Sequence, residues 1–386
     1  MSFARIRFQD AAVRMLRTAV AGDRLPHAYL FAGPRGVGKG LAARELAKLM
    51  LCRSPRGKGA DDLDACDRCT TCERVDRGVH PDVYWFRKEP DRNDLRINLV
   101  VRGRGEDSGE VTVTVTESVR LHPMEASRTI TVVDDAEYLN RAAANALLKV
   151  LEEPAPHAVL ILLCADPSQL PGTILSRCQW VRFGPLPEEF VAEKLAEVLE
   201  VKAAARAARG KEEPVVPLSA EEAVFVCRFA GGSIEQAERL AGSGLWELKR
   251  DLLARLPHMD EAEALDMGEI IGRWAAGQVK SRHVTKEARE ETAIKRESFR
   301  LALAAIASAY RDAAVLAAGA PDSVRLINLD QRSVIEELAA WPAEARIGAI
   351  NLLADAQEQI ARYVHTELAA ENALLQAGRL RPAAKV

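Results

Sequence analysis

The stretch GPRGVGKG at residues 33–40 carries the residue types that bind phosphate groups. It lies between an apolar run at 28–32 and a helical pattern over 39–51, and this order of strand, loop and helix makes the pattern specific. The glycines let consecutive backbone amides point at one phosphate, and Lys39 can reach the outer phosphates of a nucleotide. Gly40, however, stands where such loops place a Ser or Thr hydroxyl on a magnesium ion. We therefore predict a P-loop that binds nucleotide with impaired hydrolysis, or one kept only for its fold.

A pair of carboxylates follows a second apolar run, TITVVD at 129–134. Asp134 at the end of such a strand lies beside a P-loop and can orient the metal shell, while the next residue polarises the attacking water. That residue is Asp135, which is one methylene shorter than Glu, so its carboxylate sits about 1 Å short and costs roughly a hundredfold in rate. Glu137 is a poorer base because it lies beyond the strand end. The degenerate site predicted for ATP and Mg²⁺ comprises Gly33, Gly36, Gly38, Lys39, Gly40, Asp134 and Asp135.

Four cysteines have the spacing of a metal site. Cys66, Cys69 and Cys72 recur with two residues between them, and Cys52 lies at the end of the helix that follows the P-loop. Four thiolates satisfy a closed tetrahedral zinc site, and C-x2-C spacing lets two sulfur atoms converge on one ion. We predict structural Zn²⁺ held by these cysteines in preference to scattered free thiols. His80 is an alternative fourth ligand, but it reads as part of the turn into the next strand.

The chain around these residues alternates between apolar β-rich runs and helical patterns. Such alternation, with strands apolar on both faces, predicts an α/β fold in which a parallel sheet has helices on both faces. The strands are expected at 28–32, 83–86, 129–134, 157–164 and 180–183. After 184–187 the strand patterns end, and an all-α remainder follows.

Two intervals interrupt this organisation. Residues 96–117 contain two β-branched runs around a Gly-rich polar turn, which predicts an inserted hairpin. Residues 202–211 are rich in Ala and Arg and are best interpreted as a solvated helix end or loop, within a possible insertion over 202–217.

Composition bounds the class of protein. The 386 residues are 48% hydrophobic and 28% charged, as in ordinary globular proteins. A formal net charge of −3 gives no general attraction to nucleic acid, so DNA contact would need local patches or partners. Neither a secretory signal nor a run of roughly 20 apolar residues is evident, so we expect a cytoplasmic protein without a membrane partner.

Six motifs together resemble a known family, the bacterial clamp-loader AAA+ proteins, which comprise the gamma/tau and delta-prime subunits of DNA polymerase III. The resemblance covers nearly the whole chain except 87–128. The motifs are LPHAYLFAGPRGVGK, CDRCTTC, HPDVYWF, NALLKVLEEPAPH, ADPSQLPGTILSRC and YVHTELAAENALLQ. The resemblance implies an AAA+ P-loop domain at 1–186, a small helical lid at 187–246 and a helical oligomerisation collar at 247–386.

The same resemblance implies a role for Arg177, within GTILSRC. In this family the arginine reaches across a subunit interface to the γ-phosphate of a neighbour's ATP, as an arginine finger. Without the surrounding motif, a surface arginine paired with a local acid would be the default. Gly40, Asp135, the pair Cys164 and Ala165, and Glu235 replace groups that the gamma/tau motors keep, so the chain resembles the delta-prime branch, which does not hydrolyse ATP.

A delta-prime assignment implies partners and an assembly. The gamma/tau and delta subunits would complete a ring with this chain, and the ring would place the sliding clamp on primed DNA within DNA polymerase III, a nucleotidyltransferase assembly. The family alternative is a gamma-like ATPase motor with an unusual P-loop. An alternative from another class is a zinc-containing nucleic-acid-binding module with a vestigial P-loop.

Overall fold

The computed structural model of the chain describes residues 3–87, 101–102, 111–208, 218–281, 288–321, 324–362 and 365–382. The chain divides into two compact units, Met1–Pro187 and Glu188–Val386. The finer division expected near residue 246 stays a prediction.

The first unit is built on a five-stranded parallel sheet with the strand order β2-β5-β6-β1-β7. The strands are β1 (Ala28–Ala32), β2 (Val83–Phe86), β5 (Thr129–Val133), β6 (Ala158–Cys164) and β7 (Gln179–Arg182). All five apolar runs in the sequence therefore form strands, which confirms the predicted α/β class. The central strands β1, β5 and β6 are buried along their whole length, as expected for a sheet covered on both faces.

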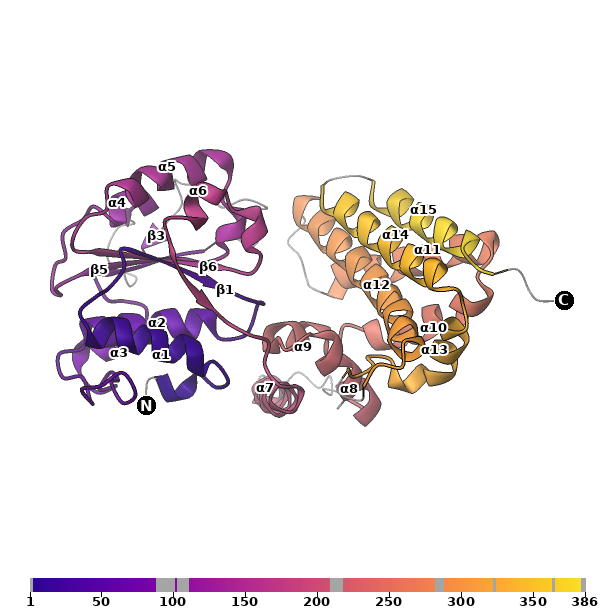
Figure 1. Ribbon diagram of the computed structural model, residues 1–386, viewed down its shortest axis with the longest axis horizontal. Helices are drawn as coiled ribbons and strands as arrows, with labels where there is room; N and C mark the ends of the chain where they lie inside the picture. Colours follow the sequence, from indigo (N-terminus) through magenta and orange to yellow (C-terminus); the bar gives the residue numbers. More distant parts are fainter. Residues whose placement is uncertain are drawn as a thin grey trace. The chain divides into compact units, whose positions relative to one another are not determined.

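Helices cover both faces of this sheet (Figure 1). One face carries α1 (Asp10–Ala21), α2 (Lys39–Leu51) and α3 (Thr70–Asp76), and the other carries α4 (Val115–Ser118), α5 (Arg141–Glu152) and α6 (Gly172–Leu175). The carboxyl ends of β1 and β6 lie side by side, since Ala32 pairs with Cys164. This register brings the P-loop, which follows β1, to the same edge of the sheet as the residues that follow β6.

The interval predicted to be a hairpin is only partly one. Strands β3 (Val101–Arg102) and β4 (Val111–Thr112) pair in antiparallel fashion, while residues 88–100 and 103–110 lie outside the described residues. The end of the expected hairpin is wrong, because α4 occupies 115–118. The Thr114 hydroxyl accepts a hydrogen bond from the Glu117 amide, and the Glu117 carboxylate accepts one from the Thr114 amide. This capping box nucleates a helix in a β-branched run.

The second unit is helical throughout its described residues. Its helices are α7 (Glu188–Ala208), α8 (Ala220–Phe229), α9 (Ile234–Leu240), α10 (Leu245–Arg255), α11 (Glu261–Ser281), α12 (Ala288–Ala317), α13 (Arg332–Ala339), α14 (Ala343–Ala361) and α15 (Thr366–Arg379). Helix α7 continues through the Ala- and Arg-rich stretch as far as Ala208, and residues 209–217 lie outside the described residues.

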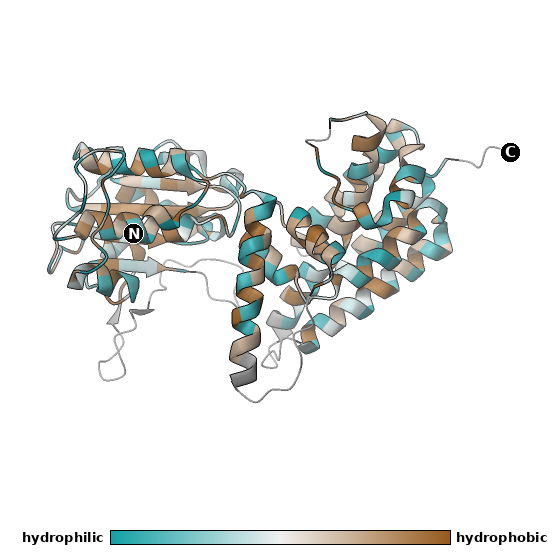
Figure 2. Ribbon diagram, turned by 90° about the horizontal axis from the view of Figure 1, so that it is seen from below, coloured by the Kyte–Doolittle hydropathy of each residue, from teal (hydrophilic) through white to brown (hydrophobic). Residues whose placement is uncertain are grey.

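The core of the second unit lies around α12, which packs against α11, α13 and α14. Its residues Leu303, Ile306 and Tyr310 are fully buried. Brown and teal residues alternate along these helices in Figure 2, as expected for amphipathic helices that share a core. None of the described helices is long and apolar enough to cross a membrane.

Candidate nucleotide site and metal centre

The backbone of the P-loop has the shape that its glycines allow. Gly33 has φ of +153°, and a Cβ atom there would lie 2.2 Å from the carbonyl oxygen of Phe183, so only glycine fits. Gly38 has φ of +101° and immediately precedes α2. The loop therefore delivers the N-terminus of a 13-residue helix, with its partial positive charge, to the edge of the sheet.

Lys39 lies inside the loop. Its Nζ donates hydrogen bonds to the carbonyl oxygens of Gly33 and Pro34, each at 2.6 Å, and the residue is only 8% exposed. Burial lowers the pKa of Lys39, against the opposing effect of the nearby Glu137 and Asp134 carboxylates. Two of the three ammonium donors are taken by the loop itself, which leaves at most one for a phosphate oxygen.

Gly40 lies in the first turn of α2, facing the sheet. A Cβ atom at this position would meet Trp85 Cζ2 at 3.8 Å and Leu163 Cδ1 at 3.9 Å, which are ordinary van der Waals distances. Packing around the Cβ position therefore does not exclude a side chain here. Gly40 therefore differs from the corresponding residue of magnesium-binding loops because it has no hydroxyl group, although the surrounding structure leaves space for a β-carbon.

Arginines contact both Asp134, predicted to orient the metal shell, and Asp135, predicted to polarise the attacking water. Asp134 Oδ2 accepts a hydrogen bond from Arg87 Nε at 3.2 Å, and its Oδ1 accepts one from the Asp135 amide at 3.1 Å. Asp135 Oδ1 lies 2.6 Å from Arg35 Nη2, and Arg35 belongs to the P-loop. Neither arginine was predicted from the sequence to lie at this site, because nothing in its local pattern indicates which carboxylate it contacts.

Glu137 lies beside these residues, although the sequence predicts that it is a poorer base than Asp135 because it lies beyond the strand end. Asp135 adopts a left-handed conformation with φ of +56°, and the turn that follows brings Glu137 back to the end of β6. The Glu137 side chain is 4% exposed, and its Oε2 accepts a hydrogen bond from the Ala165 amide at 3.2 Å. Burial, together with Glu137, raises the pKa of Cys164 to about 12. Asp adopts the left-handed conformation more readily than most residues. The Asp at position 135 was therefore the feature of the sequence that could have indicated this turn.

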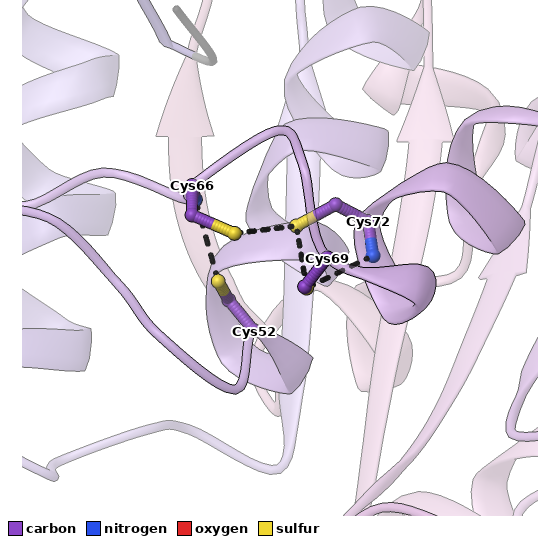
Figure 3. Close-up of side chains that lie close together, drawn as sticks. All are labelled: Cys52, Cys66, Cys69 and Cys72. Atoms are coloured by element: carbon purple, nitrogen blue, oxygen red, sulfur yellow. Dashed lines mark hydrogen bonds between the residues drawn. The ribbon is translucent and has the colours of Figure 1, made fainter.

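The four predicted cysteine ligands converge on one point (Figure 3). All four Sγ atoms lie within 4.8 Å of one another, with Cys69 and Cys72 at 3.5 Å and Cys66 and Cys72 at 4.0 Å. A tetrahedral ion with Zn–S bonds of about 2.3 Å would set sulfur atoms about 3.8 Å apart. All four cysteines are free thiols. The arrangement therefore fits a tetrahedral metal ion without rearrangement of the chain.

The fourth position of this cluster is Cys52 and not His80. Cys52 caps the C-terminus of α2, and its Sγ accepts a hydrogen bond from the Cys66 amide at 3.3 Å. His80 is buried elsewhere, where its Nδ1 accepts a hydrogen bond from the Asp82 amide at 3.2 Å. The cluster thus connects the end of the P-loop helix to the loop before α3.

Lys48 reinforces the same connection from inside. Its side chain is 1% exposed, and its Nζ lies 3.0 Å from Glu45, 2.6 Å from Asp67 and 3.0 Å from Asp76. Asp67 lies in the loop that carries Cys66 and Cys69 before α3, here called the cysteine loop, and Asp76 is the last residue of α3. Burial by itself lowers the pKa of Lys48, but the hydrogen bonds to these three carboxylates raise it above its ordinary value. Helix α2, the cysteine loop and α3 are therefore held together by one buried cation.

Arg177 lies on the surface of the first unit, between α6 and β7. Its Nη2 lies 3.0 Å from Glu152 Oε1, and its Nη1 donates to the Thr173 carbonyl oxygen at 3.1 Å. The side chain of Arg177 is 36% exposed and that of Glu152 is 53% exposed. The next residue, Cys178, points into the core, where burial raises its pKa to about 11. A buried cysteine thus anchors the segment whose arginine faces solvent.

Comparison with known proteins agrees with this geometry. The family described as "DNA polymerase III, delta subunit" matches residues 8–187, which span the sheet, the P-loop, the cysteine cluster and Arg177. Residues 8–187, just under half of the chain, are thus similar to a family of DNA polymerase III subunits. Similar proteins include DNA polymerase III subunit delta′ of Bacillus subtilis, 32% identical over 189 residues, and that of Pseudomonas aeruginosa, 32% identical over 228 residues. DNA polymerase III subunit tau of Salmonella typhimurium is 28% identical over 275 residues.

These relatives are matched over part of their length. The matches cover 49%, 59% and 70% of this chain and 51%, 59% and 38% of the three relatives, in the order just given. The chain thus spans between about two fifths and three fifths of each relative.

Cys164, Ala165 and Glu235, which are expected to replace groups that the gamma/tau motors keep, lie in two different units of the chain. Cys164 and Ala165 end β6 beside the P-loop, and the Ala165 amide donates to Glu137. Glu235 lies in the first turn of α9, in the second unit. Cys164 is fully buried and its thiol pKa is raised, so the group at the end of β6 is a neutral thiol near neutral pH.

Proposed function

We propose that this chain is a delta-prime-type subunit of a bacterial clamp loader. It would complete a ring with gamma/tau-type and delta-type subunits in the cytoplasm. That ring would place a sliding clamp on primed DNA during replication, as a component of the DNA polymerase III holoenzyme. Its own ATP site would not turn over, and Arg177 would act on the ATP bound by a neighbouring subunit.

The observation that carries the proposal is a contrast within the first unit. Gly40 supplies no oxygen for magnesium. Asp134, predicted to orient the metal shell, is paired with Arg87, and Asp135, predicted to polarise the attacking water, is paired with Arg35. Arg177, by comparison, is 36% exposed on the surface of the same unit. This contrast supports a chain that would not hydrolyse ATP at its own P-loop but would supply an arginine to a neighbouring subunit.

The ion pair that holds Arg177 is weak enough to be exchanged. An exposed pair such as Arg177 with Glu152 contributes about 0.2–1 kcal/mol. A finger arginine accelerates phosphoryl transfer roughly 10³- to 10⁵-fold, equivalent to about 4–7 kcal/mol of transition-state stabilisation. Releasing Glu152 therefore costs much less than the arginine gains at a developing phosphoryl charge. The planar guanidinium fork suits that charge, and a lysine would not replace it.

The cysteine cluster would hold structural Zn²⁺ in this account. Cys52, Cys66, Cys69 and Cys72 would occupy all four tetrahedral positions, which leaves none for a substrate. The bound ion would fix the C-terminal end of α2 to the start of α3.

The proposal is tested first on the isolated, zinc-loaded chain by measuring ATP hydrolysis. We expect no turnover above background, with or without DNA. Turnover that disappears in the Lys39→Ala variant would instead identify a gamma-like motor. DNA binding by the isolated chain that is tight and falls steeply with added salt would favour the zinc-containing nucleic-acid-binding module.

A further inference from the structure

Arginines are paired with the carboxylate that a divalent cation would need beside the P-loop and with the carboxylate that follows it. Arg35 Nη2 lies 2.6 Å from Asp135 Oδ1, and Arg87 Nη2 lies 3.2 Å from Asp134 Oδ2. In magnesium-dependent loops the ion is held by the loop hydroxyl and by the carboxylate after the neighbouring strand. Here an ion would have to displace the Arg87 guanidinium from Asp134 and would find no hydroxyl at position 40.

The half of the loop that binds phosphate is nevertheless intact. Gly36 and Gly38 have positive φ, and α2 begins directly after them. Lys39 is buried within the loop, where its ammonium is held by two neutral carbonyl oxygens. Burial lowers the pKa of Lys39, which reflects the cost of holding this cation away from water. An anion beside Lys39 would lower that cost.

The charges of the site balance without a metal ion. Lys39, Arg35 and Arg87 supply three positive charges, against three carboxylates from Asp134, Asp135 and Glu137. Carboxylates beside a phosphate normally repel it, and in magnesium-dependent loops the cation screens them. Here guanidinium groups already neutralise two of them at direct hydrogen-bonding distance. A phosphate that enters the loop therefore meets screened carboxylates and the positive end of α2.

We propose that this P-loop binds the polyphosphate group of a nucleotide without a divalent cation, with Arg35 and Arg87 in the place of the metal ion. The inference deepens the proposed function, because it gives the non-hydrolysing site a ligand. Its test uses the isolated chain, whereas the role of Arg177 is tested in the assembled ring. A negative result for metal-free nucleotide binding would therefore not disprove the role of Arg177, and a negative result for Arg177 would not disprove nucleotide binding.

The experiment is a calorimetric titration of ATP into the full-length, zinc-loaded chain. One titration contains excess Mg²⁺, and the other uses buffer freed of Mg²⁺ on a chelating resin, because soluble EDTA would also strip the cysteine site. We expect the two dissociation constants to agree within about threefold, or less than 0.7 kcal/mol. No binding in either buffer, or binding at least about tenfold tighter with Mg²⁺, would overturn the proposal.

Two variants test the part played by the arginines. Arg87→Gln leaves the Asp134 carboxylate unscreened and should weaken magnesium-free ATP binding about tenfold, the loss expected for one charged contact. Added Mg²⁺ should then recover part of the affinity. The matched control is Arg362→Gln on α14, an exposed arginine paired with Glu358, which should leave the affinity unchanged. Parental affinity in Arg87→Gln without Mg²⁺ would contradict the assigned role.

Discussion

The buried cation Lys48 offers the sharpest test of how the cysteine module supports the P-loop helix. We consider the substitution Lys48→Met, which keeps the length of the side chain and removes its charge. The substitution leaves three carboxylates without their shared partner. Asp67 and Asp76 are 23% and 37% exposed, so water can solvate them. Glu45 is 0% exposed and cannot be solvated in the same way.

The magnitude follows from Glu45. Removing one partner of a buried ion pair costs about 3–5 kcal/mol, because the remaining charge is left without compensation. Glu45 also contacts Arg5 Nη1 at 3.4 Å, and the Arg5 side chain is 58% exposed. We therefore expect the lower end of the range, about 3 kcal/mol. Neutralising the carboxylate as well, in Glu45→Gln with Lys48→Met, should restore at least about half of the loss.

The assay is hydrogen exchange followed by mass spectrometry under native conditions, because the chain has two units and a single unfolding midpoint would not be assignable. Peptides from α2 and α3 should exchange faster in Lys48→Met, and peptides from the second unit should not change. Lys149→Met on α5, at an exposed position, is the control and should change stability by less than about 0.5 kcal/mol. A loss of stability below about 1 kcal/mol in Lys48→Met, or a double variant no more stable than Lys48→Met, would show that Lys48 does not compensate the buried Glu45 charge.

Three further predictions concern the P-loop and the metal. Gly40→Ala should stabilise the first unit by about 0.5 kcal/mol, measured by hydrogen exchange of peptides from α2, because alanine favours helix and its Cβ would make ordinary contacts; a less stable variant would be inconsistent with the space seen there. Removing the metal with a chelator should make all four clustered thiols reactive and reduce helical circular dichroism from α2 and α3; unreactive thiols and an unchanged spectrum would argue against a structural metal. ATP affinity should decline with rising pH before the ordinary lysine pKa of about 10.4 is reached, because burial lowers the pKa of Lys39 and the ammonium that binds phosphate is lost; constant affinity up to about pH 10 would show that Lys39 does not carry the charge.

Local patterns were sufficient for much of the fold and of the metal centre. The five apolar runs form the five strands of the sheet, because parallel strands buried on both faces need continuous apolar sequence. Helix α2 begins at Lys39 and ends at Leu51, as expected from its glycine-rich start and its periodicity. The four cysteines converge because their spacing already placed them at one helix end and one turn.

Other features depended on contacts between distant residues. Arg87 and Asp134 are 47 positions apart, so no local pattern could pair them. Glu137 reaches the site because Asp135 adopts a left-handed conformation, and that conformation depends on the surrounding packing. The β-branched residues at the end of the 96–117 interval predict a strand, although the capping residues Thr114 and Glu117 favour the helix that forms at 115–118. The capping signal was present in the sequence and outweighed β propensity.

Our proposal is that this chain does not hydrolyse ATP at its own P-loop and that its Arg177 stimulates hydrolysis at the site of a neighbouring subunit. It is tested most directly in a clamp loader reconstituted with gamma/tau-type and delta-type partners, by comparing DNA-stimulated ATP hydrolysis for Arg177→Ala and Lys39→Ala. We predict that Arg177→Ala slows hydrolysis roughly 10³-fold or more at the site it serves, while Lys39→Ala leaves the rate unchanged. The opposite result, with Lys39→Ala stopping hydrolysis and Arg177→Ala harmless, would contradict the account.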